Sequence, residues 1–237
     1  MLMRKKRNII VLGILSLLIY ITYGMGENNT SNAKDTRNTM NSLDSKKETM
    51  TNINDRPVYK IVIDPGHGGE DPGANSTSGQ YEKDFTLQLS QKVKELAEKE
   101  KQIEIYLTRS DDHTISSIDR ERPKYANDLG ADLFISIHGN TYTDSSITGT
   151  ETYYYREESL PFTTIMHRNL VNATGLRDRG VKKEAFFVVK DTMMPAALLE
   201  VGYLTNPGEE QRMWTDDFQD RVATSIVEGI KEYLKIN

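Results

Sequence analysis

The sequence predicts an α/β fold in which helices flank a central, largely parallel or mixed sheet. From Val58 onward, short runs of β-branched and aromatic residues alternate with amphipathic helical segments, which is the pattern of an α/β sandwich. The chain has 237 residues, of which 37% are hydrophobic and 27% are charged. These values are ordinary for a globular protein, and the length allows one domain with a full core.

The first expected elements are strand, helix and strand. Residues 58–66 form a β-branched run that ends in a Pro-Gly turn, which is typical of a buried strand. A helix starts near Glu82, because Phe85, Leu89 and Val93 recur at four-residue steps. Residues 102–110 again have the composition of a strand.

The middle of the chain continues the alternation. Residues 117–130 are expected to be helical in part, with Gly130 as the C-cap. Residues 131–140 are almost continuously apolar before His138, so this strand should lie in the centre of the sheet. Residues 149–156 alternate as a further strand, and residues 160–175 form a second amphipathic helix that Gly175 ends.

The C-terminal third contains two further expected strands and a closing helix. The strands cover residues 184–191 and 195–203, and the helix covers residues 216–236 with Phe218 and Val222 on one face. The segment before them, residues 177–183, is interpreted as a basic turn.

The first 57 residues are expected to lie outside the folded domain. Residues 1–26 combine a basic cluster with an uncharged apolar run from Ile9 to about Met25, which is typical of a cleaved signal or of a membrane anchor. Both remain open, with the anchor favoured, and the positive-inside rule places the rest of the chain outside. Residues 27–57 are polar and should form a disordered tether, which leaves residues 58–237 for the catalytic domain.

Composition excludes several kinds of site. The chain contains no cysteine, so disulfides, thiolate metal sites and cysteine nucleophiles are absent, and any metal must be held by His, Asp or Glu. Beyond the N-terminal basic cluster, 26 Lys and Arg residues face 35 Asp and Glu residues, a formal charge of about −9. Such a balance argues against a nucleic-acid partner, which needs a basic face.

Three chemically active residues follow expected strands. His67 comes just after the first strand, His138 ends the third, and Glu200 closes the apolar run of residues 196–199. If these strands run parallel, their carboxyl ends meet at one edge of the sheet, where ligands bind in open α/β folds. Two imidazoles and a carboxylate suit a catalytic zinc ion, and the sequence offers Glu82 and Glu200 as the carboxylates.

The sequence also resembles a known family. The segments that carry the resemblance are IVIDPGHGGEDPGA, YEKDFTL, ADLFISIHGN, GTETYYY, DRGVKKEAFFVVK and MPAALLEVGYLTN. In this order they are similar to motifs of the zinc-dependent N-acetylmuramoyl-L-alanine amidases, from about Val58 to the C-terminus. The resemblance implies a six-stranded mixed sheet flanked by helices. It implies hydrolysis of the amide that joins the lactyl group of N-acetylmuramic acid to the L-alanine of the peptidoglycan stem peptide.

The same resemblance implies a role for each candidate site residue. His67, Glu82 and His138 match the positions of the ligands of one zinc ion per chain, and Glu200 matches the position of the general acid/base. Asp64 and Asn140 are candidates for supporting the ligands, with a turn and a strand-end cap as their alternatives.

The expected partners and location follow from this reading. The substrate is peptidoglycan, no nucleic acid is expected, and the membrane is contacted through residues 1–26 if they are retained. The protein should act at the outer face of the cytoplasmic membrane or in the cell wall, or be secreted if a signal is cleaved. An exported zinc peptidase that cuts within the stem peptide, and a catalytically silent wall-binding module, remain alternatives, and the need for an activator or localising protein is open.

Overall fold

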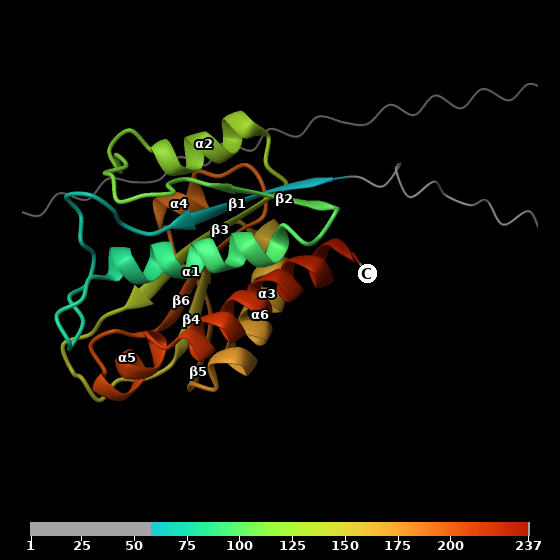
Figure 1. Cartoon of the computed structure of the whole chain (residues 1–237). Helices are drawn as coiled ribbons and strands as arrows, with labels where there is room; N and C mark the ends of the chain where they lie inside the picture. The colour runs from blue at the N-terminus through green and yellow to red at the C-terminus, as the bar shows by residue number, and fades with distance from the viewer. Residues whose placement is uncertain (1–57, 237) are drawn as a thin grey trace, which may run out of the picture. The chain divides into compact units, whose positions relative to one another are not determined.

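Six strands form one mixed sheet in the computed structural model, which describes residues 58–236 (Figure 1). The strands are β1 Tyr59–Pro65, β2 Ile103–Leu107, β3 Leu133–Asn140, β4 Thr150–Tyr154, β5 Asp178–Lys183 and β6 Ala196–Tyr203. Their order across the sheet is β2-β1-β3-β6-β4-β5. The predicted α/β fold with a mixed sheet is therefore confirmed.

The direction of the strands decides where a site can form. Neighbours from β2 to β6 pair in parallel, whereas β4 runs antiparallel to β6 and carries β5 parallel to itself. The carboxyl ends of β1, β3 and β6 consequently meet at one edge, as the sequence predicted. His67 follows the end of β1, whereas His138 and Glu200 lie within the C-terminal halves of β3 and β6.

Helices cover both faces of the sheet. They are α1 Glu82–Ala97, α2 Glu121–Leu129, the 3₁₀ turn η2 Glu157–Ser159, α3 Leu160–Thr174, α4 Phe187–Lys190, α5 Pro207–Met213 and α6 Asp216–Leu234. The larger core lies between the sheet and α1, α3 and α6, and includes Ile61 and Ile63 of β1. The smaller core, with Val62 of the same strand, lies under α2 and α4, so alternate residues of β1 serve opposite layers (Figure 1).

The helix ends and faces that the spacing predicted are present. Phe85, Leu89 and Val93 of α1 are fully buried, and α1 packs beside α6. Gly130 and Gly175 end α2 and α3 in the left-handed conformation, at φ 63° and 59°, which a residue without a Cβ adopts at low cost. The sequence did not predict α5, although Asn206 caps it by accepting from the N–H groups of Gly208 and Glu209.

Two neighbouring predictions were wrong. Residues 177–183 are strand β5 and not a turn, and residues 184–191 contain helix α4 and not a strand. β5 is the edge strand, where charged side chains are common, and a register shift between the pairs Thr150–Asp178 and Thr152–Val181 interrupts its alternation. Val188 and Val189 are buried against the smaller core, and a short apolar run of this kind fits a strand or a helix equally well.

The two histidines outside the candidate site, His113 and His167, have structural contacts. His167 in α3 joins Thr152 Oγ1 of β4 at 2.9 Å to Asp178 Oδ1 of β5 at 2.8 Å. Thr152 is fully buried and His167 is 7% exposed, so the imidazole links two strands inside the fold. The His113 imidazole pairs with its neighbour Asp111 in an exposed loop.

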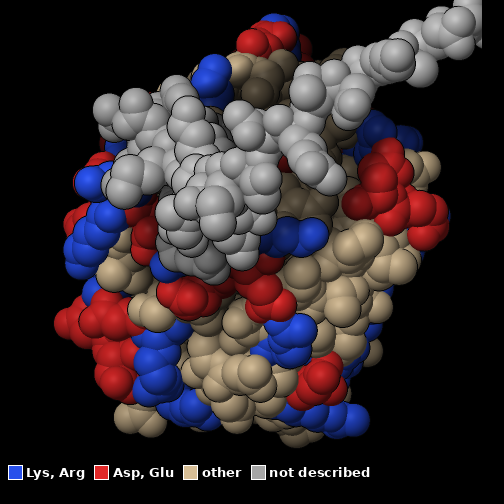
Figure 2. Space-filling view, turned by 90° about the vertical axis from the view of Figure 1, so that its right-hand side faces the viewer, with Lys and Arg blue, Asp and Glu red and all other residues tan. Residues whose placement is uncertain are grey.

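The N-terminal predictions lie outside the described residues. The expected export segment, residues 1–26, and the expected tether, residues 27–57, stay predictions. Within residues 58–236, no helix has the length and apolar character needed to cross a membrane. On the face shown in Figure 2, acidic and basic side chains are interspersed between uncharged ones where the surface is visible.

A buried ion pair ties the strand ends together on the side of the smaller core. Asp64 is fully buried and accepts hydrogen bonds from Arg122 Nη1 of α2 at 2.6 Å and from Ser136 Oγ of β3 at 2.7 Å. Thr108 Oγ1, just after β2, donates at 2.6 Å. Burial alone would raise the pKa of Asp64, but Arg122 and the two hydroxyls hold it below its ordinary value.

Replacing Asp64 by Ala should destabilise the domain strongly, because it leaves the Arg122 guanidinium buried without its carboxylate. The free energy of unfolding, measured by urea denaturation of residues 57–237, should fall by about 3–5 kcal/mol. Asp128→Ala is the matched control, since Asp128 pairs with Lys124 on the exposed surface of α2, and its cost should stay below about 1 kcal/mol. An equal loss of unfolding free energy in the two variants would contradict the proposed contribution of the buried pair to stability.

Candidate active site

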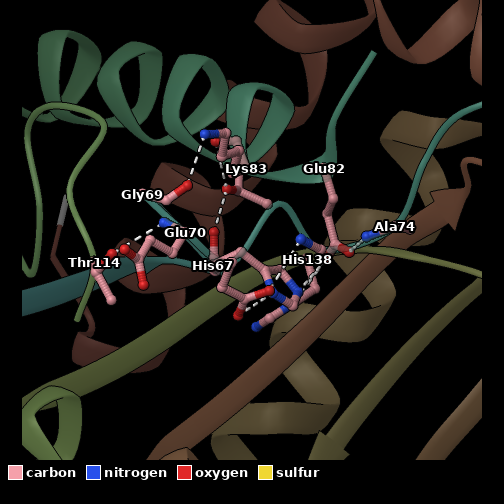
Figure 3. A network of polar contacts seen from close by, with 12 residues as sticks. His67, Gly69, Glu70, Ala74, Glu82, Lys83, Thr114 and His138 are labelled. Carbon is pink, nitrogen blue, oxygen red and sulfur yellow. Dashed lines mark hydrogen bonds and ion pairs between the residues drawn. The ribbon is translucent and has the colours of Figure 1, made fainter. Parts of the chain in front are cut away.

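Three side chains from separate elements meet at the predicted edge of the sheet. His67 lies in the turn after β1, Glu82 is the first residue of α1, and His138 lies near the end of β3. Each offers one ligand atom, and these atoms lie within 4.8 Å of one another. Figure 3 shows the three side chains turned toward a common point. Glu82 Oε1 is 3.2 Å from His67 Nε2 and 2.9 Å from His138 Nδ1.

The turn that carries His67 is strained and is held from outside. His67 has φ 61°, the left-handed region that residues with a side chain rarely occupy. Arg122 Nη2 donates to His67 O at 2.6 Å. The fully buried Arg109 donates from Nη2 to Gly66 O at 2.9 Å and from Nε to Pro65 O at 3.2 Å. Two guanidinium groups therefore fix the carbonyl groups of this turn and, with them, the imidazole.

Gly66 allows the turn to approach β3. A Cβ at this position would lie 2.3 Å from Cε1 of His138, far inside van der Waals contact. The missing side chain therefore leaves the space in which the ring of His138 sits. The ring centroids of His67 and His138 are 5.0 Å apart and their planes are nearly perpendicular.

The Glu82 carboxylate is buried and fully hydrogen-bonded. Its Oε1 also accepts from the N–H of Gly139 at 3.1 Å, and its Oε2 accepts from the N–H of Ala74 at 2.9 Å. Burial would raise the pKa of Glu82, but the hydrogen bonds and charges of the two histidines outweigh it and hold the pKa far below its ordinary value. Glu82 is therefore a fixed anion.

A further carboxylate orients His67. Asp71 Oδ2 lies 2.8 Å from His67 Nδ1, so the opposite ring nitrogen, Nε2, faces the ligand cluster. Such a carboxylate fixes the tautomer of a metal-binding imidazole. Sequence reasoning missed Asp71. Its signal was an acidic residue four positions after the histidine, inside the same turn.

The supporting roles considered for Asp64 and Asn140 are resolved differently. Asp64 supports His67 indirectly. It pairs with Arg122, and Arg122 in turn donates to the carbonyl of His67. Asn140 Oδ1 accepts from the N–H of Thr141 at 2.8 Å, and its carbonyl accepts from the N–H of Leu204. Asn140 thus terminates β3, as its alternative reading predicted.

Glu200 is placed differently from Glu82. It pairs in register with His138 across β3 and β6, so both side chains leave the sheet on the same face. Its Oε2 is buried and has no hydrogen-bond partner among the described residues. Burial, followed by the negative charges of Glu82 and Glu151, raises the pKa of Glu200 well above its ordinary value.

The donor set fits a divalent metal. It comprises two imidazole nitrogens and one carboxylate oxygen, which is the usual ligand set of a catalytic zinc with an open position. The unpartnered oxygen of Glu200 lies on the same face of the sheet, where a cation would offset its charge. The His-Glu-His group can therefore hold a metal ion with a second, proton-accepting carboxylate beside it.

A cleft leads to these residues. A cavity of about 540 Å³ is lined by His67, His138 and Glu200, and its other walls are largely apolar and include Ile115, Ile118, Phe186, Phe187 and Val188. The volume is that of an ordinary small-molecule site. A bulky substrate can therefore reach the ligand cluster and Glu200 together.

The chain is similar to known proteins. The family model described as N-acetylmuramoyl-L-alanine amidase (Amidase_3) matches residues 61–232. The N-acetylmuramoyl-L-alanine amidase CwlM of Bacillus licheniformis is 38% identical over 177 residues, which cover 73% of this chain and 68% of that protein.

Solved structures agree with the sequence match. The catalytic domain of the amidase CwlV from Bacillus (Paenibacillus) polymyxa var. colistinus has a TM-score of 0.74 at 45% identity, and the match covers 76% of this chain and 100% of that one. An N-acetylmuramoyl-L-alanine amidase from Clostridium difficile 630 has a TM-score of 0.73 at 37% identity, covering 76% of this chain and 98% of that one.

Asp71→Asn should weaken metal binding without unfolding the domain. The amide removes the negative charge that orients His67 Nδ1, and the loss of such a partner typically lowers metal affinity by about 10–100-fold. Competition with a chelating dye measures the affinity, and circular dichroism checks the fold. Glu70→Gln is the control, because Glu70 is the exposed neighbouring acid and only its backbone N–H is hydrogen-bonded. Equal affinities in the two variants would contradict the role of Asp71.

Glu200 should make the metal-free protein less stable as the pH rises. Its pKa in the folded state lies above the ordinary value of 4.5, so the folded state binds more protons than the unfolded state, and stability is lost as the pH rises from 4.5 through the folded pKa. Glu200→Gln removes this titration. The difference in unfolding free energy between Glu200→Gln and the parent protein, both with chelator, should therefore grow in favour of the variant with increasing pH. A difference that does not change with pH would contradict the raised pKa.

Proposed function

This chain belongs to the N-acetylmuramoyl-L-alanine amidase family and is a peptidoglycan hydrolase, and we propose that it works with one zinc ion. In this proposal His67, Glu82 and His138 hold the ion, and Glu200 is the general acid/base. The single observation that carries the proposal is the combination of the His-Glu-His group with an unpartnered, buried oxygen of Glu200 on the same face. The reaction is hydrolysis of the amide between the lactyl group of N-acetylmuramic acid and the L-alanine of the stem peptide.

Zinc is the ion that this donor set favours. The ligands are nitrogen and oxygen atoms, the set contains no sulfur, and three protein ligands leave a position open. When bound, zinc polarises a carbonyl group and makes water acidic near neutral pH. Asp71 holds His67 in the tautomer that presents Nε2 to the ion.

Glu200 moves the protons of the reaction. As a carboxylate it accepts the proton of the attacking water, and as a carboxylic acid it then donates this proton to the alanine nitrogen that leaves. The raised pKa of Glu200 supports this dual role, because a group with a pKa nearer neutrality can both take and return a proton. Glu82 cannot replace it, since the histidines hold that carboxylate as an anion.

The protein should act outside the cytoplasmic membrane. Its substrate, peptidoglycan, lies there, and residues 1–26 combine a basic cluster with an apolar run in the manner of an export signal or anchor. Retention of this segment would keep the enzyme at the membrane surface, and its cleavage would release the enzyme to the wall. A localising or activating protein is compatible with either arrangement.

Glu200→Gln should abolish hydrolysis while the metal stays bound, because the amide cannot shuttle a proton. Purified residues 57–237, loaded with zinc, are incubated with muropeptides, and the product masses are read. We expect free stem peptide and intact lactyl glycan from the parent protein, and a loss of at least about 100-fold in the variant. His67→Ala should instead lose the metal, measured by elemental analysis.

Controls separate this proposal from its rivals. Glu184→Gln changes an exposed carboxylate of the same domain and should leave the rate unchanged. Cleavage within the stem peptide would identify a peptidase and overturn the proposed bond. Loss of zinc in Glu200→Gln would place Glu200 among the ligands, and full zinc content in His67→Ala would remove His67 from them.

A further inference from the structure

A second cavity lies beside the active site, over β4, β5 and the end of β6. Its volume is about 330 Å³, and its lining includes Glu151, Tyr153, Arg179, Lys182 and Tyr203. None of these residues belongs to the metal-ligand group or to the proton shuttle. Unlike the largely apolar cavity beside His67, His138 and Glu200, this cavity is bordered by two cationic side chains, Arg179 and Lys182.

One buried carboxylate fixes both cations. Lys182 Nζ donates to Glu151 Oε2 at 2.8 Å, and Arg179 Nε donates to Oε1. The hydroxyls of Tyr203 and Tyr153 donate to the same carboxylate. Burial would raise the pKa of Glu151, but these donors lower it to about 2. Two positive charges therefore surround one negative charge and leave the cluster with a net charge of +1.

Aromatic rings restrict the cations further. The Arg179 guanidinium lies 5.5 Å from the centre of the Tyr203 ring, and Lys182 Nζ lies 5.7 Å from the centre of the Tyr153 ring. A cation held by a ring and by a carboxylate loses little additional freedom when it binds a ligand. The cluster is accordingly preorganised.

Both cations keep unused donors. Among the described residues, Arg179 uses Nε on Glu151 and Nη1 on Thr148 O, while Nη2 has no hydrogen-bond partner. Lys182 uses one of its three N–H groups, on Glu151. The two side chains are 25% and 39% exposed, so their remaining N–H groups can reach a ligand in the cavity that they line.

The distance from this cavity to His138 and Glu200 corresponds to a few residues of an extended peptide. Glu151 pairs in register with Glu200 across β4 and β6, and Glu200 pairs with His138 across β3. Strands are about 4.8 Å apart, so this row extends roughly 10 Å from β3 to Glu151 on β4, the carboxylate that Arg179 and Lys182 of β5 contact. An extended peptide advances about 3.3–3.6 Å per residue. The cavity is thus two or three residues away from the amide that is cut.

We propose that Arg179 and Lys182 bind a carboxylate of the stem peptide, within the three residues that follow the cleaved amide. This inference rests on the proposed function. A guanidinium beside an ammonium matches the planar geometry and charge of a carboxylate, and a single carboxylate neutralises the cluster. Two positions can supply it: an α-carboxylate at the second residue, where the chain continues through the γ-carboxyl of D-glutamate, or a side-chain carboxylate at the third.

Three synthetic substrates distinguish these sources. All are muramoyl tripeptides with L-alanine first and an amidated C-terminus. The first carries D-glutamate then lysine, the second carries D-isoglutamine then lysine, and the third carries D-isoglutamine then meso-diaminopimelate with its distal carboxylate free. Zinc-loaded residues 57–237 should cleave the first or the third with a kcat/KM at least about tenfold above the second, because only these carry the free carboxylate. The substrate that is preferred identifies the position.

Arg179→Gln and Lys182→Gln should reduce this preference to within about twofold. Lys183→Gln is the matched control, since Lys183 lies next in β5, pairs with Glu157 and does not line the cavity. It should keep the full preference. The readout is a ratio of two rates in the same preparation, so a partly unfolded variant does not distort it. Arg179→Lys, which keeps the charge, should recover part of the preference.

The outcomes separate this inference from the proposed function. Cleavage of all three substrates at equal kcat/KM would overturn the carboxylate site and leave the amidase mechanism intact. Without cleavage of any substrate the proposed function fails, and calorimetry of the free tripeptides then decides the inference. At least about tenfold tighter binding of a carboxylate peptide than of its amide, lost in Arg179→Gln, would support it; equal affinities would overturn it.

Discussion

The site depends on one strained turn and on the two arginines that hold it. His67 has a left-handed backbone, and from this turn its Nε2 lies 3.2 Å from Glu82 Oε1. Arg109 and Arg122 bind three successive carbonyl groups, those of Pro65, Gly66 and His67. Arg122 is itself fixed by the buried Asp64. The ion pair between Asp64 and Arg122 on one face of the sheet therefore also fixes the position of His67 at the edge of the sheet.

The pKa values of two glutamates of one site are shifted in opposite directions by their surroundings. Glu82 accepts two backbone N–H groups and faces two imidazoles, whereas Glu200 has a buried oxygen without a partner and lies near two anions. Identical side chains thus become a fixed anion and a carboxyl group with a raised pKa. The difference comes from hydrogen bonds and neighbouring charges and not from the depth of burial, because Glu82 is itself 4% exposed.

The sequence predicted much of this arrangement, for physical reasons. His67 follows an apolar strand in a glycine turn, and His138 and Glu200 interrupt apolar runs. A residue type that is costly in a core therefore marked two of the positions, and parallel strands bring their carboxyl-terminal parts together. Asp71 and Arg109 were missed, since a loop acid and a lone arginine do not differ in sequence from solvated residues. Likewise, nothing local distinguishes β5 from a turn or α4 from a strand, because the edge of the sheet and the smaller core decide both.

The antiparallel strand β4 brings further charged residues next to Glu200. β1, β3 and β6 bring the His-Glu-His group and Glu200 to one edge. By pairing with β6, β4 places Glu151 opposite Glu200, and its parallel partner β5 supplies Arg179 and Lys182. A buried anion next to Glu200 helps to raise the pKa of Glu200, and under the proposed subsite the cations paired with Glu151 bind a carboxylate of the substrate peptide. In that proposal, one register pairing connects the proton chemistry of the site to the charge of its substrate.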